Sequence, residues 1–319
     1  MKTLMIYGAT GYTGRMAAEQ AKELGLNLVI AGRDEARLAS LAAALGVPYR
    51  VFVAQESRLE GIDVLLNFAG PFAHTAEPLM RACIASGTDY LDITAEINVY
   101  RLAEQLGSGA DVMLLPGVGW DVVPTDCLAM HVASRVRQPR ALNIALQVPG
   151  TMSRGSAMSV GEILGAGVMV RIDGALVATP DAPLQHLDFG DGPVLCAPLS
   201  FGDLVSAWHS SSIPNIAMFV HVTGEAFPEG DLSLLPDGPT QTQRDAHRAR
   251  AVAEVTGADG SVARSVIETV NGYSYTPLAA VEAARRVLGG ERRPGFETPA
   301  KLFGVGFAQT IAGTRIIDY

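Results

Sequence analysis

The chain has 319 residues, of which 48% are hydrophobic and 18% are charged, and its formal net charge is -9 at pH 7. This length is sufficient for two domains that each bury a core. The charge is modest and negative and includes no block of lysine or arginine, which argues against a surface for nucleic acid or for an anionic membrane.

The first predicted element is an apolar strand that runs directly into a glycine turn, and residues 4–14 read LMIYGATGYTG. Gly8 permits a tight turn, Gly11 lets backbone N–H groups approach a phosphate, and Gly14 lets the following helix pack closely on the strand. The pattern is typical of a turn that binds a dinucleotide pyrophosphate, although glycine in a strand-turn-helix can also serve packing alone. The residues expected to contact the cofactor here are Gly8, Thr10, Gly11, Tyr12, Thr13 and Gly14.

The end of the second apolar run indicates which dinucleotide is bound. A carboxylate at this point binds the ribose hydroxyls of NAD, whereas an arginine binds the 2′-phosphate of NADP. Arg33 stands here and offers a planar, permanently charged fork, with which Arg15 and Arg37 could converge. Asp34 allows the NAD interpretation, but it also fits the N-cap of the next helix. We therefore expect NADP(H).

Strands and helices alternate through the first part of the chain, which predicts a parallel, doubly wound sheet of the Rossmann type. The expected strands are residues 3–7, 27–31, 50–53, 62–67, 89–92 and 111–115. The expected helices are residues 13–25, 35–45, 75–86, 97–106 and 124–135. Such sheets bind ligands beyond the carboxyl ends of their strands, so the loops there become the site candidates.

After about residue 138 the pattern predicts a mostly antiparallel sheet. Strands are expected over residues 141–148, 216–223, 250–256 and 261–270, and helices over 155–168 and 277–288. The predicted fold class is α/β, with a Rossmann NADP-binding domain over residues 1–125 and a second, α+β domain for substrate or dimerisation over residues 126–319. The C-terminal segment, about residues 290–319, could return to the first domain.

Two loops after predicted strands supply further cofactor candidates. The first contains Asn67, Phe68, Ala69, Gly70 and Pro71, which are expected to contact the cofactor largely through backbone groups. A simple Gly-Pro turn explains this loop nearly as well. In the second loop, Asp92 could bridge the sheet and the cofactor ribose, or cap the helix that follows.

Hydride transfer requires a proton donor or an electrostatic clamp beside the nicotinamide. Asp121 is one candidate, because it follows a strand within a tight glycine-containing loop. His74, near a predicted cofactor loop, is a second, although the exposed first turn of a helix is the alternative location. Tyr90, at the end of a strand, is a third. The remaining histidines are scattered without carboxylates at ligand spacing, so no metal site is expected.

The start of the predicted helix in the second domain contains a further polar group. Ser153, Arg154 and Ser156 could present N–H groups and a guanidinium to an anionic substrate, or could simply cap the helix. Tyr273 and Tyr275 could point into the cleft or fill the core.

The three cysteines are far apart and lack metal-ligand spacing, which fits buried thiols in a reducing cytosol. The first strand begins by the third residue, which leaves no room for a signal peptide. No apolar run reaches the ~18 residues that a spanning helix needs. We therefore expect a cytoplasmic protein with no membrane partner.

Taken together, the motifs resemble those of the saccharopine dehydrogenase-like oxidoreductases, a group that also contains proteins called trans-acting enoyl reductases. The matching segments span the chain and are residues 8–15, 31–33, 70–72, 90–94, 116–126 and 295–300. Ala95 stands where such proteins often carry glycine, and Trp120 where phenylalanine is frequent. The resemblance therefore does not imply that this chain makes or cleaves saccharopine.

The resemblance implies NADP(H), a Rossmann domain and a second α/β domain that covers the nicotinamide and often mediates dimers. We expect an oxidoreductase that transfers hydride to or from a C=O, C=N or activated C=C bond of a small organic substrate, with a homodimer through the second domain. The alternative is a protein that binds NADP without turnover, as a redox sensor or accessory protein. The glycine turn is common to both, because function resides in the site.

Overall fold

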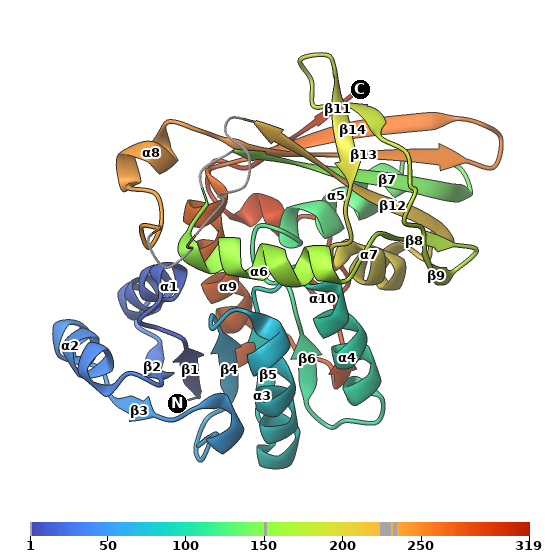
Figure 1. Ribbon diagram of the computed structural model, residues 1–319. Coiled ribbons are helices and arrows are strands. Elements are labelled where there is room, and N and C mark those ends of the chain that lie inside the picture. Colours follow the sequence, from blue (N-terminus) through green and yellow to red (C-terminus); the bar gives the residue numbers. More distant parts are fainter. Residues whose placement is uncertain (1, 150–151, 224–230, 232–234) are drawn as a thin grey trace.

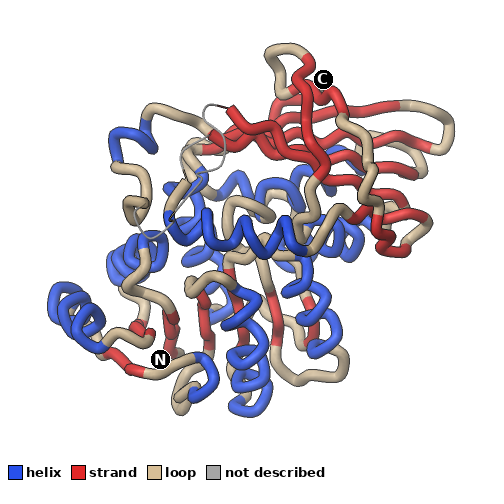
Figure 2. Tube along the Cα trace, in the orientation of Figure 1, coloured by secondary structure: helices blue, strands red, loops and turns tan. Residues whose placement is uncertain are grey.

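Two β-sheets form the framework of the molecule, one below the other in the view of Figure 1, with their strands in red in Figure 2. The computed structural model describes residues 2–149, 152–223, 231 and 235–319. The predicted α/β fold class, with a Rossmann-type sheet and a second, mostly antiparallel sheet, is confirmed.

The first sheet consists of seven parallel strands. In chain order they are β1 (Thr3–Tyr7), β2 (Asn27–Gly32), β3 (Tyr49–Val51), β4 (Val64–Asn67), β5 (Asp89–Asp92), β6 (Met113–Leu115) and β15 (Gly295–Phe296). Their order in space is β15-β6-β5-β4-β1-β2-β3, so the direction of winding reverses beside β1. Ligands of doubly wound sheets bind at such a reversal, beyond the carboxyl ends of the strands.

Helices cover both faces of this sheet. One face carries α1 (Tyr12–Glu23), α2 (Glu35–Leu45) and α9 (Gly272–Leu288), and the other carries α3 (Phe72–Ser86) and α4 (Ile97–Gly107). The cause is visible in β1, where Leu4 and Ile6 join one hydrophobic core while Met5 and Tyr7 join the other. Alternate residues of a strand point to opposite faces, so a strand that is apolar throughout is buried on both sides.

The second sheet has nine strands, all paired antiparallel except β7 with β12. They are β7 (Pro139–Pro149), β8 (Met169–Ile172), β9 (Ala175–Ala178), β10 (Gln185–Asp188), β11 (Pro193–Pro198), β12 (Asn215–Thr223), β13 (Ala249–Gly257), β14 (Val262–Thr269) and β16 (Arg315–Asp318). The strands predicted over residues 250–256 and 261–270 are present as β13 and β14, which pair directly with each other.

Further helices lie between the sheets or at their edges (Figure 1). They are α5 (Val123–Ala133), α6 (Arg154–Gly165), α7 (Asp203–Ser211), α8 (Gln241–Asp245), α10 (Pro299–Phe303) and the 3-10 turns at Ala54–Glu56 and Ala308–Thr310. Within the described ranges, none of the helices has both the length and the apolar character needed to cross a bilayer. All three cysteines are buried, as predicted.

The C-terminal part of the chain contributes to both sheets. Strand β15 pairs with β6 in the first sheet, whereas β16 pairs with β14 in the second. Helix α9, which lies within the predicted second domain, packs against α1 through a face rich in buried alanine. The domain limits at residues 125 and 126 stay a prediction.

One aromatic ring fills the junction between the two halves. Tyr100 of α4 is fully buried, and its hydroxyl donates a hydrogen bond to the Thr94 carbonyl at 2.9 Å. A Cβ atom at Gly202 would overlap the ring, and one at Gly117 would overlap the hydroxyl. The Gly202 N–H in turn donates to the Ala95 carbonyl at 3.0 Å. Glycine at both positions therefore lets the ring sit between loops of the two halves.

We expect Gly202→Ala to lower the free energy of unfolding by about 1–3 kcal/mol, because the added methyl forces the Tyr100 ring or the loop to shift. Gly161→Ala in α6 is the matched control, since a Cβ there meets no atom within 4 Å. Denaturant unfolding measures both variants. Equal stabilities would contradict the steric role assigned to Gly202.

Candidate functional site

A cavity of about 540 Å³ lies beyond the carboxyl ends of β1, β2 and β4 and extends to the second half of the chain. One part is lined by the glycine turn and the loops of the first sheet. The other part is lined by α6, by residues of β7 and β12 and by the start of α9. The reversal of winding beside β1 thus coincides with the cavity, as expected for a doubly wound sheet.

The glycine turn forms a close-fitting cradle at one end of this cavity. Gly8 has φ +80°, and a Cβ there would lie 2.8 Å from the Ala69 nitrogen. A Cβ at Gly14 would overlap the Gly8 carbonyl. Gly11, the N-cap of α1, provides no side chain to bond the first N–H groups of the helix. These groups and the positive end of the helix dipole are therefore available to an anion such as a pyrophosphate.

The structure places all six predicted residues of the turn on the cavity wall, namely Gly8, Thr10, Gly11, Tyr12, Thr13 and Gly14. Because glycine has no Cβ at the tightest points of the turn, the pyrophosphate of a dinucleotide can approach the backbone closely. Their direct contact with a cofactor stays a prediction.

Two arginines line the cavity beyond β2. Arg33 and Arg37 both have exposed side chains there, and Arg37 Nη2 donates to the Thr10 carbonyl at 2.9 Å. Asp34 also borders the cavity, but its Oδ1 accepts the Arg37 N–H at 3.0 Å as the N-cap of α2. Positive charge therefore dominates at the position that distinguishes the two dinucleotides.

The loop after β4 is shaped by a buried amide. Asn67 Nδ2 donates to Thr75 Oγ1 at 3.1 Å and to the Tyr90 hydroxyl at 3.2 Å, while its Oδ1 accepts the Ala69 N–H at 2.9 Å. The loop residues that line the cavity are Phe68, Ala69 and Gly70. Asn67 and Pro71 do not line it, so Asn67 acts by fixing the loop rather than by reaching the cavity.

Asp92 and Tyr90 form a second buried network. The Tyr90 hydroxyl donates to Asp92 Oδ2 at 2.9 Å, and Asp92 Oδ1 accepts the N–H groups of Thr94 at 3.0 Å and Gly117 at 2.9 Å. Burial raises the pKa of Asp92 to about 7. Neither side chain lines the cavity, so the structure does not bring them to the place predicted for them. Asp92 instead ties the loops after β5 and β6 together.

His74 is also placed away from the cavity. Its side chain is 70% exposed in the first turn of α3, and its Nε2 lies 3.8 Å from Glu162 Oε1. The sequence missed Glu96, whose buried carboxylate accepts the N–H groups of Phe72 at 2.8 Å and Ala73 at 2.7 Å. A cap contributed from a distant loop leaves no local pattern, which is why sequence spacing could not reveal it.

Asp121 is the predicted acid that does line the cavity. Burial raises the pKa of Asp121 to about 6, and no described residue forms a hydrogen bond with its carboxyl group. Beside it, Trp120 forms part of the wall, and its indole Nε1 donates to Thr269 Oγ1 at 2.9 Å. The Trp120 N–H donates to Thr276 Oγ1 at 3.0 Å. Both halves of the chain thus hold the loop that carries Asp121.

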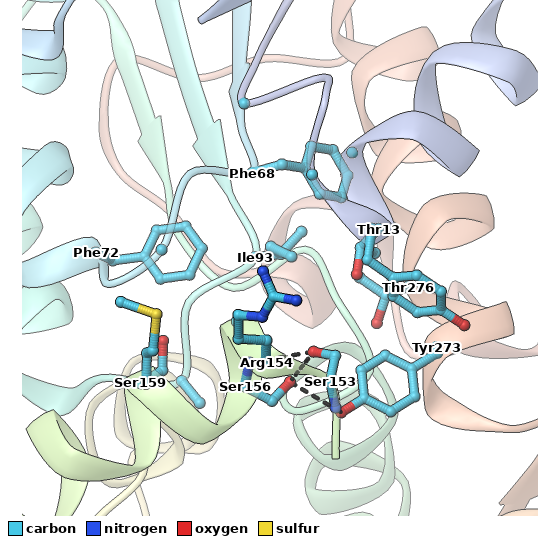
Figure 3. A pocket seen from close by; sticks show the side chains of 18 of the residues that line it. Thr13, Phe68, Phe72, Ile93, Ser153, Arg154, Ser156, Ser159, Tyr273 and Thr276 are labelled. Atoms are coloured by element: carbon cyan, nitrogen blue, oxygen red, sulfur yellow. Dashed lines mark hydrogen bonds between the residues drawn. The ribbon is translucent and has the colours of Figure 1, made fainter. Parts of the chain in front are cut away.

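A polar cluster caps α6 on the opposite wall. The Tyr273 hydroxyl accepts the Ser153 N–H at 2.8 Å and donates to Ser156 Oγ at 3.0 Å, as Figure 3 shows. Ser153 Oγ accepts the Ser156 N–H at 3.1 Å, which is the capping alternative predicted for these serines. Tyr275 is buried, and its hydroxyl donates to the Ala308 carbonyl at 3.2 Å. Tyr273 therefore faces the cavity and Tyr275 fills the core.

The rest of the second-domain wall is largely apolar. Its polar residues include Arg154, Ser159, Asp237 and Asn271. In Figure 3 the Arg154 guanidinium points from α6 toward Ile93, while its Nε donates to the Leu235 carbonyl at 3.0 Å. The apolar residues that line this part are Val148, Met152, Met158, Val160, Ile163, Leu164, Leu199, Phe201, Val220 and Ala249. Such a wall favours an apolar substrate that leaves little water in the cavity.

Known proteins match this chain in sequence, most clearly in its first part. Residues 4–110 match the family model of the saccharopine dehydrogenase NADP binding domain. A trans-acting enoyl reductase of Mycobacterium leprae is 31% identical over 153 residues, which cover 43% of this chain and 37% of the relative. One of Mycobacterium tuberculosis is 30% identical over 139 residues, covering 39% and 33%. The chain thus spans about a third of the length of these curated relatives.

Solved structures share the fold over the whole chain. Saccharopine dehydrogenase (L-Glu forming) from Saccharomyces cerevisiae has a TM-score of 0.64 and 14% identity, with 100% of both chains covered. A myo-inositol dehydrogenase from Corynebacterium glutamicum has a TM-score of 0.51 and 14% identity, covering 100% of this chain and 98% of the other. Identities this low show the fold alone. With the sequence matches, they confirm the predicted resemblance to the saccharopine dehydrogenase-like group.

We expect Gly14→Ala to reduce the affinity for a nicotinamide dinucleotide by at least ~10-fold, because the added methyl displaces the Gly8 carbonyl and opens the cradle. Gly306→Ala is the control, since a Cβ there meets no atom within 4 Å. Fluorescence titration with NADPH measures both affinities. Unchanged binding by the Gly14 variant would separate the turn from the cofactor.

Proposed function

We propose that this chain, whose residues 4–110 match a saccharopine dehydrogenase NADP-binding domain, is an NADP(H)-dependent oxidoreductase acting on a small, largely apolar organic molecule. One observation carries the proposal: the glycine cradle and the unpaired carboxyl group of Asp121 open into the same cavity. A cofactor seated on the cradle extends toward the far end of that cavity, where the apolar wall of the second half begins.

NADP(H) is favoured over NAD(H) by the charge beyond β2. Arg33 and Arg37 line the cavity there, and Asp34 is engaged in capping α2. A guanidinium binds a phosphate through two parallel hydrogen bonds, which the ribose hydroxyls of NAD cannot offer. The name of the matching family model supports the same choice.

Asp121 is the proton donor in this proposal. When bound, NADPH supplies the hydride that reduces the substrate. The carboxyl group of Asp121 supplies the accompanying proton, because burial holds its pKa at about 6 and keeps part of the population protonated near neutrality. Trp120 and the apolar wall exclude water and orient the reacting bond toward the acid.

The reacting bond is a C=O, C=N or activated C=C bond. The names of the trans-acting enoyl reductases and the apolar wall support an activated C=C bond in a hydrophobic molecule. A homodimer through the second domain and a cytoplasmic location complete the proposal. In a redox sensor that binds NADP without turnover, the unpaired acid at the cavity would have no role.

Replacing Arg33 by alanine should weaken NADPH binding by ~10- to 100-fold and leave NADH binding unchanged, because only the 2′-phosphate loses its charged hydrogen bonds. Arg15→Ala is the matched control, since Arg15 is exposed and paired with Glu19 at 3.1 Å rather than lining the cavity. Titration with both dinucleotides measures the effect. Tighter binding of NADH by the unaltered protein, insensitive to Arg33, would contradict NADP selectivity.

Asp121→Asn should lower kcat for reduction by ~100-fold or more, since an amide cannot serve as the acid. In the unaltered enzyme, kcat/KM for reduction should fall as the pH rises through about 6, because the protonated form of Asp121 is lost, and the reverse oxidation should show the opposite trend. The measurement is NADPH oxidation with enoyl thioesters, enones, imines and carbonyls. His74→Gln, outside the cavity, should retain activity; an Asp121 variant with full activity would remove this residue from the donor role.

A further inference from the structure

Among the described residues, most of the buried side-chain atoms that lack a hydrogen-bond partner lie at one interface between helices. Among the described residues, buried side-chain atoms without a hydrogen-bond partner are Asp126 Oδ1, both carboxyl oxygens of Asp203, Ser206 Oγ, Glu297 Oε2 and Thr314 Oγ1. All except Thr314 lie on α5, on α7 or directly before α10, and these three helices pack together. Buried polar groups are normally satisfied by protein or by ordered water, so this concentration indicates water between the helices.

Helix α7 presents these groups as a stripe. Asp203, Ser206 and Ser210 are spaced by three and four residues and therefore share one face of the helix. Asp203 and Ser206 have no exposed surface. The sequence does not predict this helix, because a polar stripe turned inward cancels the usual apolar periodicity.

Asp203, at the inner end of the stripe, lies close enough to Asp121 for the two carboxyl groups to interact electrostatically. Thr125 Oγ1, one turn along from Asp121, donates to the Asp121 carbonyl at 3.2 Å. Burial, reinforced by the nearby carboxylates of Asp126 and Asp121, raises the pKa of Asp203 to about 8. Asp203 is therefore a protonated carboxylic acid in neutral solution, close to the group that must be reprotonated after each reduction.

The outer end of the stripe reaches solvent. The Ser210 and Thr298 hydroxyls lie 2.5 Å apart, and both hydrogen-bond with Asp126, whose Oδ2 also accepts the Ala300 N–H at 2.8 Å. His209, beside Ser210, has a side chain 26% exposed, and its Nε2 lies 2.7 Å from Glu104 Oε1. Burial raises the pKa of Asp126, and the hydrogen bonds that it accepts and the nearby His209 partly oppose that rise.

We propose that Asp203 and Asp126, with water held between α5 and α7, carry protons from the surface pair of His209 and Glu104 to Asp121. The inference rests on the proposed donor role of Asp121. When Asp121 has given its proton to the substrate, its carboxylate takes one from Asp203 through a bridging water. Asp203 is reprotonated by way of Asp126, and His209 takes a proton from solvent. One proton enters for each substrate reduced, and no electron moves along the route.

The groups around Asp203 favour transport of a proton rather than binding of a metal ion. The titratable groups near it are Asp121 directly before α5, Asp126 in α5 and Tyr100 in α4. Among the described residues, no group of three His, Cys, Asp or Glu side chains is arranged to hold a metal ion. Asp121 lines the cavity proposed to hold cofactor and substrate, so a route through the helices behind it would reach solvent without crossing that cavity.

The test is Asp203→Asn, which keeps the shape of the neutral acid but cannot pass its proton on. We expect kcat for reduction to fall by ~10-fold or more with KM unchanged, and to recover as the concentration of an imidazole buffer rises, because a small diffusing acid replaces the route. Ser206→Ala should act in the same direction. Asp89→Asn is the control, because the Asp89 carboxylate is buried and paired with Arg292 at 2.6 Å but lies off the route. This variant should be less stable, and its kcat should not depend on the imidazole concentration.

A second measurement needs no cofactor. Because the folded-state pKa of Asp203 lies above the unfolded value of 3.8, the unaltered protein should lose stability between about pH 4 and pH 8, and Asp203→Asn should remove that part of the loss. Infrared difference spectra should show a protonated carboxylic acid that is absent from the variant.

The outcomes separate the two proposals. If Asp121→Asn abolishes reduction while Asp203→Asn keeps the original kcat and shows no buffer dependence, the proton route is overturned and the donor role of Asp121 stands. If Asp121→Asn is fully active, the donor role fails and the route to it fails as well, even where the infrared spectra show that Asp203 is protonated.

Discussion

The site depends on the buried carboxylate of Asp92. It is surrounded by hydrogen bonds from the Thr94 and Gly117 N–H groups and from the Tyr90 hydroxyl, which also accepts from Asn67. Three loops that follow neighbouring strands are thereby fixed relative to one another. A buried carboxylate is costly unless such donors surround it, so the loops and the acid stabilise each other. This arrangement fixes the positions of the cavity wall at Phe68 and of the loop that carries Asp121.

Residues from the second half of the chain complete the site that the loops of the first sheet begin. Trp120 is held by Thr269 and Thr276, and the Tyr100 ring lies against Gly202. Each contact joins a loop of the parallel sheet to an element far along the sequence. The cradle for the cofactor is therefore local in sequence, whereas the place for the substrate is assembled from distant segments.

That difference explains how much could be predicted from sequence. The parallel sheet, its helices and the glycine turn follow from local periodicity and spacing, and all six turn residues line the cavity. The three candidates for the proton donor lie in different places. Asp121 lines the cavity, whereas His74 is exposed and Tyr90 is buried with Asp92. Whether a polar side chain at a strand end turns toward a ligand or toward a neighbouring loop depends on tertiary contacts. Short elements such as α10, β15 and β16 were missed because too few residues carry their pattern.

The return of the chain to the first sheet has a consequence for how such proteins can be compared and divided. The match to the family model ends at residue 110, yet α9 and β15, which cover and extend that sheet, come from beyond residue 270. Without α9, the buried alanines that it packs against α1 would leave an apolar surface on the sheet uncovered. The segment that matches the family model is thus not by itself a unit of folding.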